Sequence, residues 1–243
     1  MAIRSGLIAI GPYERRNAIV EMKMKRGKEM TIVITMTDKG PRSKKAKHGR
    51  PKYMTEIDGK PAFYRAMSGL GAVSANRHVF VAPSIAGARA FIEGQCGQLA
   101  ITDYRIVLYD FEISGPAECV MVAAPHLPAG KGLLIYDIGS VTAPLEVDPG
   151  RLCGDGFVVL PSKFGNGKAT GAVQVENPDE TCRFSEDGGG VYYFKSAALY
   201  EQLYYDCYVH GGEPMLKGGR QIAPLYGQLL RQGGTVYSTV AVR

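Results

Sequence analysis

The sequence has no apolar run that approaches the roughly 18 residues needed for a membrane-spanning helix. Its N-terminus also lacks the apolar core of a secretory signal peptide. None of its cysteines forms a Cys-x-x-Cys pair, so their spacing predicts neither a disulfide framework nor a zinc knuckle. The five cysteines are Cys96, Cys119, Cys153, Cys182 and Cys207. We therefore expect a soluble cytoplasmic protein with free thiols and no membrane partner.

Signatures of several catalytic classes are missing as well. Nothing resembles a Ser-His-Asp nucleophile set, and His78, His126 and His210 do not have the spacing of metal ligands. The segment GNGKATG around Lys168 lacks the Gly-x4-Gly-Lys-Ser/Thr spacing of a P-loop. These absences argue against a serine hydrolase, a histidine-rich metal centre and a P-loop NTPase.

The chain has 243 residues, 45% of them hydrophobic, and no long low-complexity tract or internal repeat. That composition fits one large domain with a substantial core, which we assign to residues 30–243. Residues 1–29 are polar and basic without a convincing periodicity. We interpret them as an N-terminal extension, and an ordinary helix or strand docked on the domain edge is the alternative.

Short apolar runs alternate with helical patterns over the first half of the domain. The runs TIVITM, HVFVAP, YRIVLYD and GLLIYDIGS predict buried strands. Helical patterns begin near Pro61, at Ser84 and at Gly115. The connections between them are a few residues long, which is typical of an α/β domain with a parallel central sheet.

The second half has a different pattern. DGFVVLPS, KATGAVQVE and GGGVYYFK predict antiparallel strands with turns between them, and TVYSTVAV predicts a last strand. Helices are expected over about 196–207 and 219–232. The predicted fold class is therefore α/β, with a mixed, mostly parallel central sheet and flanking helices.

Seven basic residues follow the first predicted strand within fourteen positions, with no acid between them. They are Lys39, Arg42, Lys44, Lys45, Lys47, Arg50 and Lys52. The formal charge is +6, from 29 Lys and Arg against 23 acids, and without these seven the balance is 22 against 23, or −1. Ligands gather at the carboxyl ends of parallel strands, so the loop predicts phosphate binding. A solvated loop, a nuclear-import signal and a nucleic-acid patch are the alternatives, and nucleic acid is disfavoured because the charge is local.

The segment VITMTDKGPR, with RPKYMTEIDGKP after it, resembles the opening of the sugar-phosphate nucleotidyltransferases. That family's signature is roughly Ala-Gly-x-Gly-x-Arg, then Pro-Lys after a spacer, and Gly40, Arg42, Pro51 and Lys52 match it. SGPAECV looks like the family's base-side Gly-x-Ala turn, and LLIYDIGS occupies the place of its metal-binding strand. GGGVYYFKSAALYEQL is similar to the strand and helix near its sugar site, so the similarity of order covers roughly 31–243.

The resemblance implies a Rossmann-like GT-A nucleotidyltransferase fold. It also implies transfer of a nucleotidyl group from a nucleoside triphosphate to a sugar phosphate, or a similar phosphorylated small molecule, with release of pyrophosphate for nucleotide-sugar and polysaccharide biosynthesis. As catalytic residues, Arg42 would bind the leaving pyrophosphate and Lys52 would bridge the substrate and the α-phosphate, while Asp137 would hold Mg²⁺. The residues expected to line the nucleotide are Met36, Thr37, Asp38, Lys39, Gly40, Gly115 and Ala117.

Two segments depart from the family pattern. Thr37 and Asp38 stand where the family has Ala-Gly, and Asp137 is followed by Ile138 and Gly139 instead of a second acid. A nucleotide- or nucleotide-sugar-binding relative without turnover and a GT-A-type glycosyltransferase are therefore the alternative functions. The nucleobase, the sugar and the oligomeric state stay open, and a homo-oligomer is compatible with the sequence.

Overall fold

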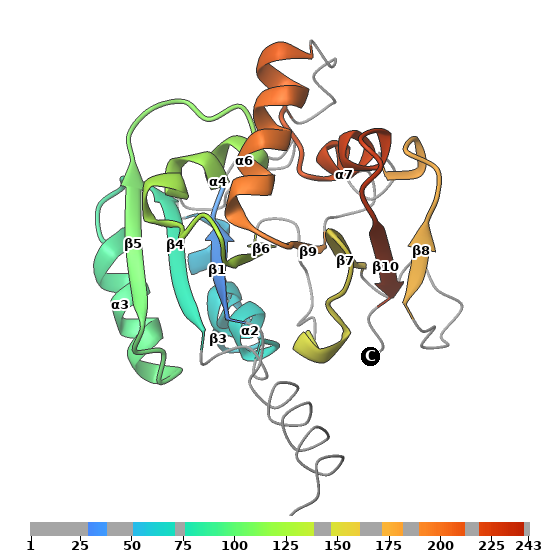
Figure 1. The fold of residues 1–243 in the computed structure, drawn as a ribbon. Coiled ribbons are helices and arrows are strands. Elements are labelled where there is room, and N and C mark those ends of the chain that lie inside the picture. The colour runs from blue at the N-terminus through green and yellow to red at the C-terminus, as the bar shows by residue number, and fades with distance from the viewer. Residues whose placement is uncertain are drawn as a thin grey trace, which may run out of the picture.

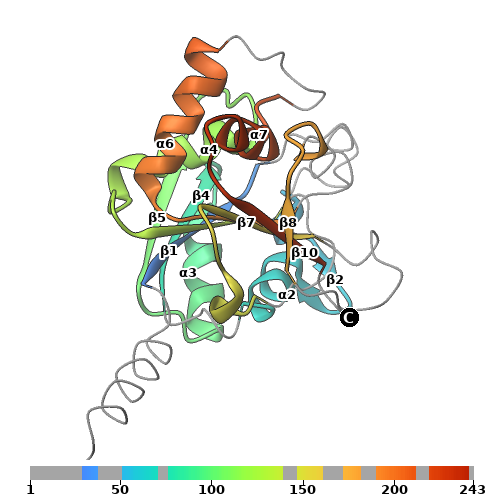
Figure 2. The same ribbon diagram turned by 45° about the vertical axis from the view of Figure 1, so that its right-hand side comes forward.

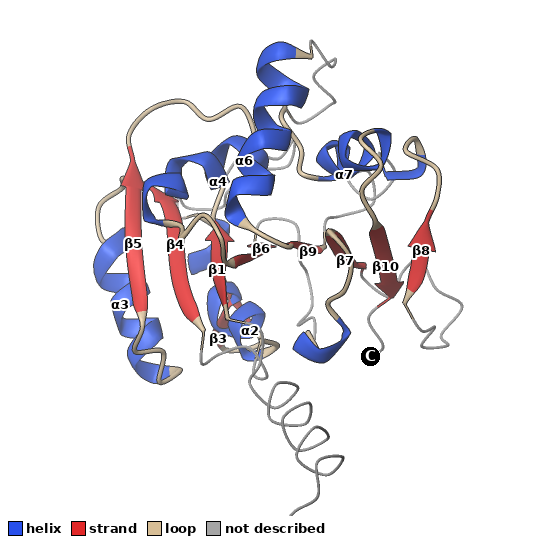
Figure 3. Ribbon diagram, in the orientation of Figure 1, coloured by secondary structure: helices blue, strands red, loops and turns tan. Residues whose placement is uncertain are grey.

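The structure is a computed structural model, and it describes residues 29–37, 51–70, 76–138, 147–160, 172–181, 190–211 and 219–240. Within these ranges an eight-stranded sheet is covered by helices on both faces (Figure 1, Figure 3). The predicted extension lies almost entirely outside the described residues, so its role stays a prediction. No helix in the described part of the chain is long and apolar enough to cross a membrane.

The sheet has the strand order β5-β4-β1-β6-β9-β7-β10-β8. Its strands are β1 (Met30–Thr35), β4 (Arg77–Pro83), β5 (Tyr104–Tyr109), β6 (Gly132–Asp137), β7 (Gly156–Leu160), β8 (Val173–Val175), β9 (Val191–Phe194) and β10 (Val236–Val240). Strand β9 is antiparallel to both of its neighbours, β6 and β7, and β8 is antiparallel to β10. All other pairs are parallel, so β5, β4, β1, β6, β7 and β10 run in one direction.

The predicted mixed, mostly parallel sheet with flanking helices is confirmed. The prediction of antiparallel strands in the second half is confirmed for the pair β7–β9 and for β8, which pairs antiparallel with β10, while β7 also pairs parallel with β10 on its other side. The strand DGFVVLPS is apolar in an unbroken run, and such a run fits either direction because direction depends on the partner strand. Strands of both halves lie in the same eight-stranded sheet.

Two groups of helices cover the two faces of the sheet (Figure 1, Figure 2). Helices α2 (Ala62–Ser68) and α3 (Ala88–Gln98) pack on one face, and α4 (Pro116–Ala123), α6 (Ala197–Tyr205) and α7 (Ala223–Arg231) pack on the other. Shorter helical turns are η3 (Lys52–Met54), η5 (Ala124–His126), η6 (Pro149–Arg151) and the π-helical turn η8 (Asp206–His210). Helix α3 begins at Ala88 after Gly87 and not at Ser84, which corrects the predicted start.

Alternate residues of the central strands point into two separate cores. Ile32 and Ile34 of β1 lie in the cluster under α2 and α3, whereas Val33 lies in the cluster under α4, α6 and α7. Phe80 and Val79 of β4 divide in the same way. Because both faces are covered, most positions of the central strands are buried, which explains why their sequences are apolar at nearly every position.

A small hairpin lies in the segment IDGKP, directly before α2. Strands β2 (Glu56–Ile57) and β3 (Lys60–Pro61) pair antiparallel and are joined by Asp58 and Gly59, whose φ angles are 50° and 72°. Asp-Gly tolerates positive φ at both central positions of such a turn. The hairpin leads directly into α2.

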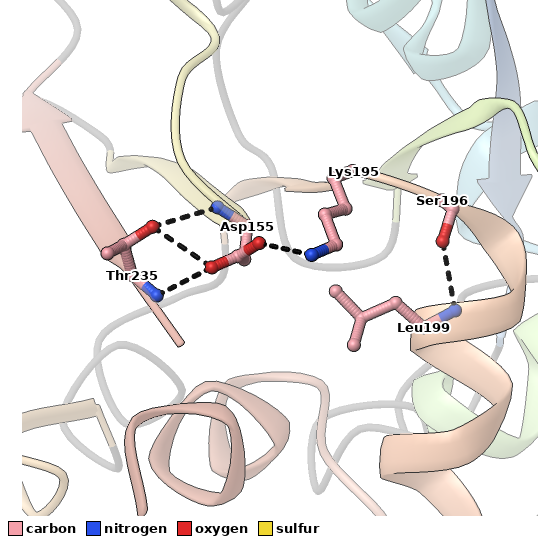
Figure 4. Close-up of polar contacts among 5 residues, drawn as sticks. All are labelled: Asp155, Lys195, Ser196, Leu199 and Thr235. Carbon is pink, nitrogen blue, oxygen red and sulfur yellow. Dashed lines mark hydrogen bonds and ion pairs between the residues drawn. The ribbon is translucent and has the colours of Figure 1, made fainter. Parts of the chain in front are cut away.

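A polar tie joins three strands at the edge where β7 and β10 begin (Figure 4). Oδ2 of Asp155 accepts hydrogen bonds from the backbone N–H of Thr235 at 2.8 Å and from its Oγ1 at 3.1 Å. Nζ of Lys195, just after β9, donates to Oδ1 of Asp155. The hydrogen bond from Lys195 and then the backbone N–H of Thr235 hold the pKa of the Asp155 carboxyl below its usual value.

We predict that Asp155→Asn lowers the free energy of unfolding by about 1–3 kcal/mol at pH 7, because an amide cannot accept all three hydrogen bonds. The lowered pKa means that the carboxylate contributes fully above the ordinary value of 3.8 and loses its contribution as the pH falls through the folded-state pKa. Urea unfolding at pH 7 and at pH 3 measures both effects. The matched control is Asp179→Asn, since the side chain of Asp179 is 88% exposed. Equal stability of Asp155→Asn and wild type at pH 7 would show that the hydrogen bonds of Asp155 with Thr235 and Lys195 do not stabilise the fold.

His78 is a titratable residue inside the core. It lies in β4 with no exposed surface and stacks on Phe80, with ring centroids 6.0 Å apart. Burial lowers its pKa from 6.5 to about 4, against a smaller opposing effect of the backbone at Asn76 and Asp103 and of the Asp103 charge. The folded protein therefore holds His78 neutral at neutral pH.

We predict that acid unfolds the protein partly through His78. Between pH 6.5 and pH 4 the unfolded chain binds a proton at this histidine and the folded chain does not, so stability falls as the pH falls. At 1.36 kcal/mol per pKa unit, the lowered pKa of His78 corresponds to a loss of about 3 kcal/mol in the free energy of unfolding over this pH range. Unfolding free energies of wild type and His78→Gln, measured from pH 7 to pH 4, test this. The two curves should converge toward pH 4, and parallel curves would rule out the role of His78.

Candidate functional site

The carboxyl ends of β1, β4 and β6 meet at one edge of the sheet. Thr35 pairs in register with Val81 of β4 on one side and with Asp137 of β6 on the other. Beyond the strands, Met36 N–H donates to the Val81 carbonyl at 3.0 Å and Ile138 N–H donates to the Thr35 carbonyl at 3.1 Å. The predicted metal residue Asp137 therefore lies beside the end of the strand that leads into the basic loop.

A buried hydrogen bond joins the two strand ends. Thr35 Oγ1 donates to Oδ1 of Asp137 at 3.1 Å, across 102 residues of sequence. Thr35 has no exposed surface and Asp137 is 5% exposed. A carboxylate is costly to bury unless it is hydrogen-bonded, and Thr35 supplies such a donor. The sequence prediction did not include Thr35, although a polar residue that ends an apolar strand was a usable signal.

The charge of Asp137 acts on two neighbouring buried side chains. Burial raises the pKa of the Cys119 thiol well above its usual value, and the Asp137 carboxylate raises it further. Burial and then the same carboxylate raise the pKa of Tyr192, against a hydrogen bond with the backbone of Gly190. Cys119 lies on α4 and Tyr192 on β9, and both side chains belong to the core cluster under α4, α6 and α7. Both side chains stay protonated at neutral pH.

The base-side turn lies at the start of α4. Gly115 is the N-cap of that helix, and Ala117 is fully buried in its first turn. A Cβ atom on Gly115 would lie 2.5 Å from the backbone oxygen of Arg220, so only glycine fits here. The Ala117 N–H donates to the same oxygen at 3.0 Å. A segment close to α7 therefore packs directly against the predicted nucleotide-binding turn.

Lys52 opens η3 and is partly exposed. Its carbonyl accepts a hydrogen bond from the Thr55 N–H at 3.0 Å, and the next residue, Tyr53, packs against Phe91 of α3 with ring centroids 5.8 Å apart. Tyr53 and Met36 belong to the same core cluster. The packing of Tyr53 thus anchors the backbone that carries Lys52 on the same side of the sheet as the side chain of Met36.

Comparison with solved structures identifies the fold, whereas no family model and no curated protein matches the chain. The nucleoside-diphosphate-sugar pyrophosphorylase from Vibrio cholerae RC9 is 20% identical, with 88% of this chain and 92% of that chain covered and a TM-score of 0.67. The inositol-1-phosphate CTP transferase from T. maritima is 14% identical, with 88% and 86% covered and a TM-score of 0.60. A nucleotidyl transferase from Methanothermobacter thermautotroptrophicus is 14% identical, with 89% of each chain covered and a TM-score of 0.55. The chain has the nucleotidyltransferase fold.

The nucleotidyltransferase fold agrees with the family that the motifs resemble, but part of the predicted site is outside the described residues. Asp38, Lys39, Gly40 and Arg42 all lie in the range 38–50, which the structure does not describe. Met36 is buried, and Thr37 is partly exposed directly after it. The predicted contacts of all these residues with nucleotide stay predictions, as do those of Gly115, Ala117 and Lys52.

Asp137 is the residue that fits the expected metal ion. Within the described ranges no group of three or more His, Cys, Asp or Glu residues is arranged to hold a metal. A dedicated protein cage is therefore not formed by the described part of the chain. Mg²⁺ is often held by one or two carboxylates together with substrate phosphates and water, and one carboxylate at a strand end meets that requirement.

We predict that Thr35→Val, which replaces the hydroxyl by a methyl group of similar size, lowers the free energy of unfolding by about 1–3 kcal/mol. The substitution removes a hydrogen-bond donor from a buried carboxylate. Thr35→Ser keeps a hydroxyl and should regain most of the loss. Urea unfolding of the three proteins at pH 7 measures this, and equal losses in the Val and Ser variants would show that packing and not the hydrogen bond is responsible.

Proposed function

We propose that the protein transfers a nucleotidyl group from a nucleoside triphosphate to a sugar phosphate or a similar phosphorylated small molecule, with release of pyrophosphate. The observation that carries this proposal is the buried Asp137 carboxylate, hydrogen-bonded by Thr35 at the carboxyl edge of the parallel strands. Ligands of open α/β sheets bind at that edge. Solved structures with the same fold bear the names nucleoside-diphosphate-sugar pyrophosphorylase and inositol-1-phosphate CTP transferase, which supports the same class of reaction.

The proposed reaction is a direct displacement at phosphorus. An oxygen of the acceptor phosphate attacks the α-phosphorus of the triphosphate, the bond from that phosphorus to the β-bridging oxygen breaks, and pyrophosphate leaves with the bonding electrons. Positioning and charge neutralisation supply most of the rate in such transfers. We assign Lys52 to the acceptor phosphate and the α-phosphate, and Arg42 to the pyrophosphate that leaves.

A covalent enzyme intermediate is not part of this proposal. Cys119 is fully buried, and burial and the Asp137 charge raise its pKa well above the usual value, so its thiol is not a nucleophile at neutral pH. The acceptor phosphate is itself a sufficient nucleophile once it is held in line. Residues of the site therefore need to bind and orient two phosphates, not to react with them.

Asp137 is the residue we assign to Mg²⁺. Such an ion would neutralise negative charge on the phosphate oxygens during transfer. The hydroxyl of Thr35 donates to Oδ1 of this carboxylate and holds it at the carboxyl end of β6. We further propose that the reaction takes place in the cytoplasm and that a nucleotide-sugar product supplies polysaccharide biosynthesis, because nucleotide-sugars are the donors for sugar transfer.

We predict that the protein releases pyrophosphate only when one matching triphosphate and one phosphorylated acceptor are present together with Mg²⁺. A coupled assay over the four ribonucleoside triphosphates, their deoxy forms and a panel of sugar 1-phosphates measures this release. Lys52→Ala should lower turnover about 100-fold or more, the usual cost of removing one preorganised charge donor.

The matched control is Lys131→Ala, which removes an exposed lysine at the opposite edge of the sheet, where it pairs with Glu29 at 2.8 Å. That variant should keep turnover within a few-fold of wild type. Nucleotide binding without pyrophosphate release for any acceptor would replace the proposal with a binding function. Wild-type turnover in Lys52→Ala would remove Lys52 from the mechanism.

A further inference from the structure

The segment Gly219–Arg220, before α7, contacts the start of α4 through backbone hydrogen bonds. The N–H of Arg220 donates to the Ser114 carbonyl at 3.0 Å, and the Arg220 carbonyl accepts from the Ala117 N–H at 3.0 Å. Gly219, with φ of +86°, lies so close that a Cβ atom there would be 1.4 Å from the Ser114 oxygen. Glycines on both sides, Gly115 and Gly219, make this contact possible.

A layer of side chains reinforces the same contact. Oε2 of Glu118 accepts from the Ser114 N–H at 2.5 Å, and its Oε1 lies 3.5 Å from Nη1 of Arg220. The same Nη1 donates to the Tyr204 hydroxyl at 2.6 Å. Glu118 thus connects the turn to Arg220, and Arg220 connects both to α6.

Aromatic rings enclose the Arg220 guanidinium. It lies 5.7 Å from the ring centroid of Tyr204 and 6.0 Å from that of Tyr208. The Tyr208 hydroxyl donates to the carbonyl of Gln221, the next residue, at 2.6 Å. The side chains of Arg220 and Glu118 are 28% and 26% exposed, so this charge pair is shielded more than a surface pair. These contacts hold Arg220 in one place.

We propose that Arg220 is a positioning residue for the nucleotide-side turn, a proposal that rests on the proposed function. Its side chain, anchored by Glu118 and Tyr204, keeps its backbone against Ser114 and Ala117 and so maintains the shape of the Gly115–Ala117 turn. Arg220 contacts the turn and does not need to contact nucleotide. Loss of its side chain weakens binding of the triphosphate and leaves the transfer step and the acceptor phosphate largely unaffected.

Steady-state kinetics of the full-length protein test this inference. In Arg220→Ala the KM for the triphosphate should rise about tenfold, while kcat and the KM for the sugar phosphate stay within threefold, because a distorted binding turn reduces ground-state and transition-state binding alike. Arg220→Lys keeps the charge and the reach toward Glu118 and should recover part of the affinity, although it lacks the planar guanidinium. Tyr204→Phe, which keeps the ring and removes the hydroxyl, should give an intermediate KM.

Arg89→Ala is the matched control, because Arg89 is an exposed arginine of α3 whose partner Glu93 lies one turn away on the same helix. It should leave all three constants unchanged. Equilibrium binding of the triphosphate alone can be detected from the rise in the unfolding temperature that it causes. This measures the same affinity without turnover.

The outcomes are separable. An active wild type with an unchanged triphosphate KM in Arg220→Ala overturns the positioning role alone. A parallel fall in kcat with both KM values unchanged means a smaller folded fraction and also overturns it. A wild type that neither binds a triphosphate nor releases pyrophosphate overturns the proposed function, and this inference with it.

Discussion

The parallel pairing of β1 with β4 and β6 is the constraint on which the rest of the structure depends. It requires cover on both faces, and two helix layers with two separate cores supply it. The same pairing aligns the carboxyl ends of the three strands, because parallel neighbours in register end together. Thr35 and Asp137 lie side by side because β1 and β6 pair in register from their first to their last residues. Packing of the sheet and assembly of the candidate site therefore have one common cause.

Strand β9 joins the two halves of the sheet. It runs antiparallel between β6 and β7, so the strands on both sides of it keep the same direction. Its first residues lie beside Asp137, whose charge raises the pKa of Tyr192, and its last residue is followed by Lys195, which binds Asp155 at the other edge. The strand thus connects the candidate site to the polar tie that holds β7 and β10.

The candidate site contains a buried carboxylate, that of Asp137, and residues from distant parts of the chain stabilise the site. A carboxylate that is 5% exposed costs free energy unless it is hydrogen-bonded, and its placement at the strand edge argues for a role beyond packing. Thr35 supports that carboxylate from a neighbouring strand, and Arg220 supports the turn at Gly115 from the segment before α7. Each support acts on a group that we assign to a ligand, so precision at the site depends on elements that need not touch the ligand.

The sequence by itself determined which segments form buried strands, since unbroken apolar runs such as TIVITM and HVFVAP are stable only when both faces are covered. It also placed Asp137 at a strand end and Gly115 at a helix start, because these depend on local pattern. Tertiary structure alone decided the parallel pairing of β7 with β10, the hydrogen bond from Thr35 to Asp137 and the contact of Arg220 with Ser114. Those features join residues about a hundred positions apart. Strand order and register bring such residues together, and local sequence carries no record of either.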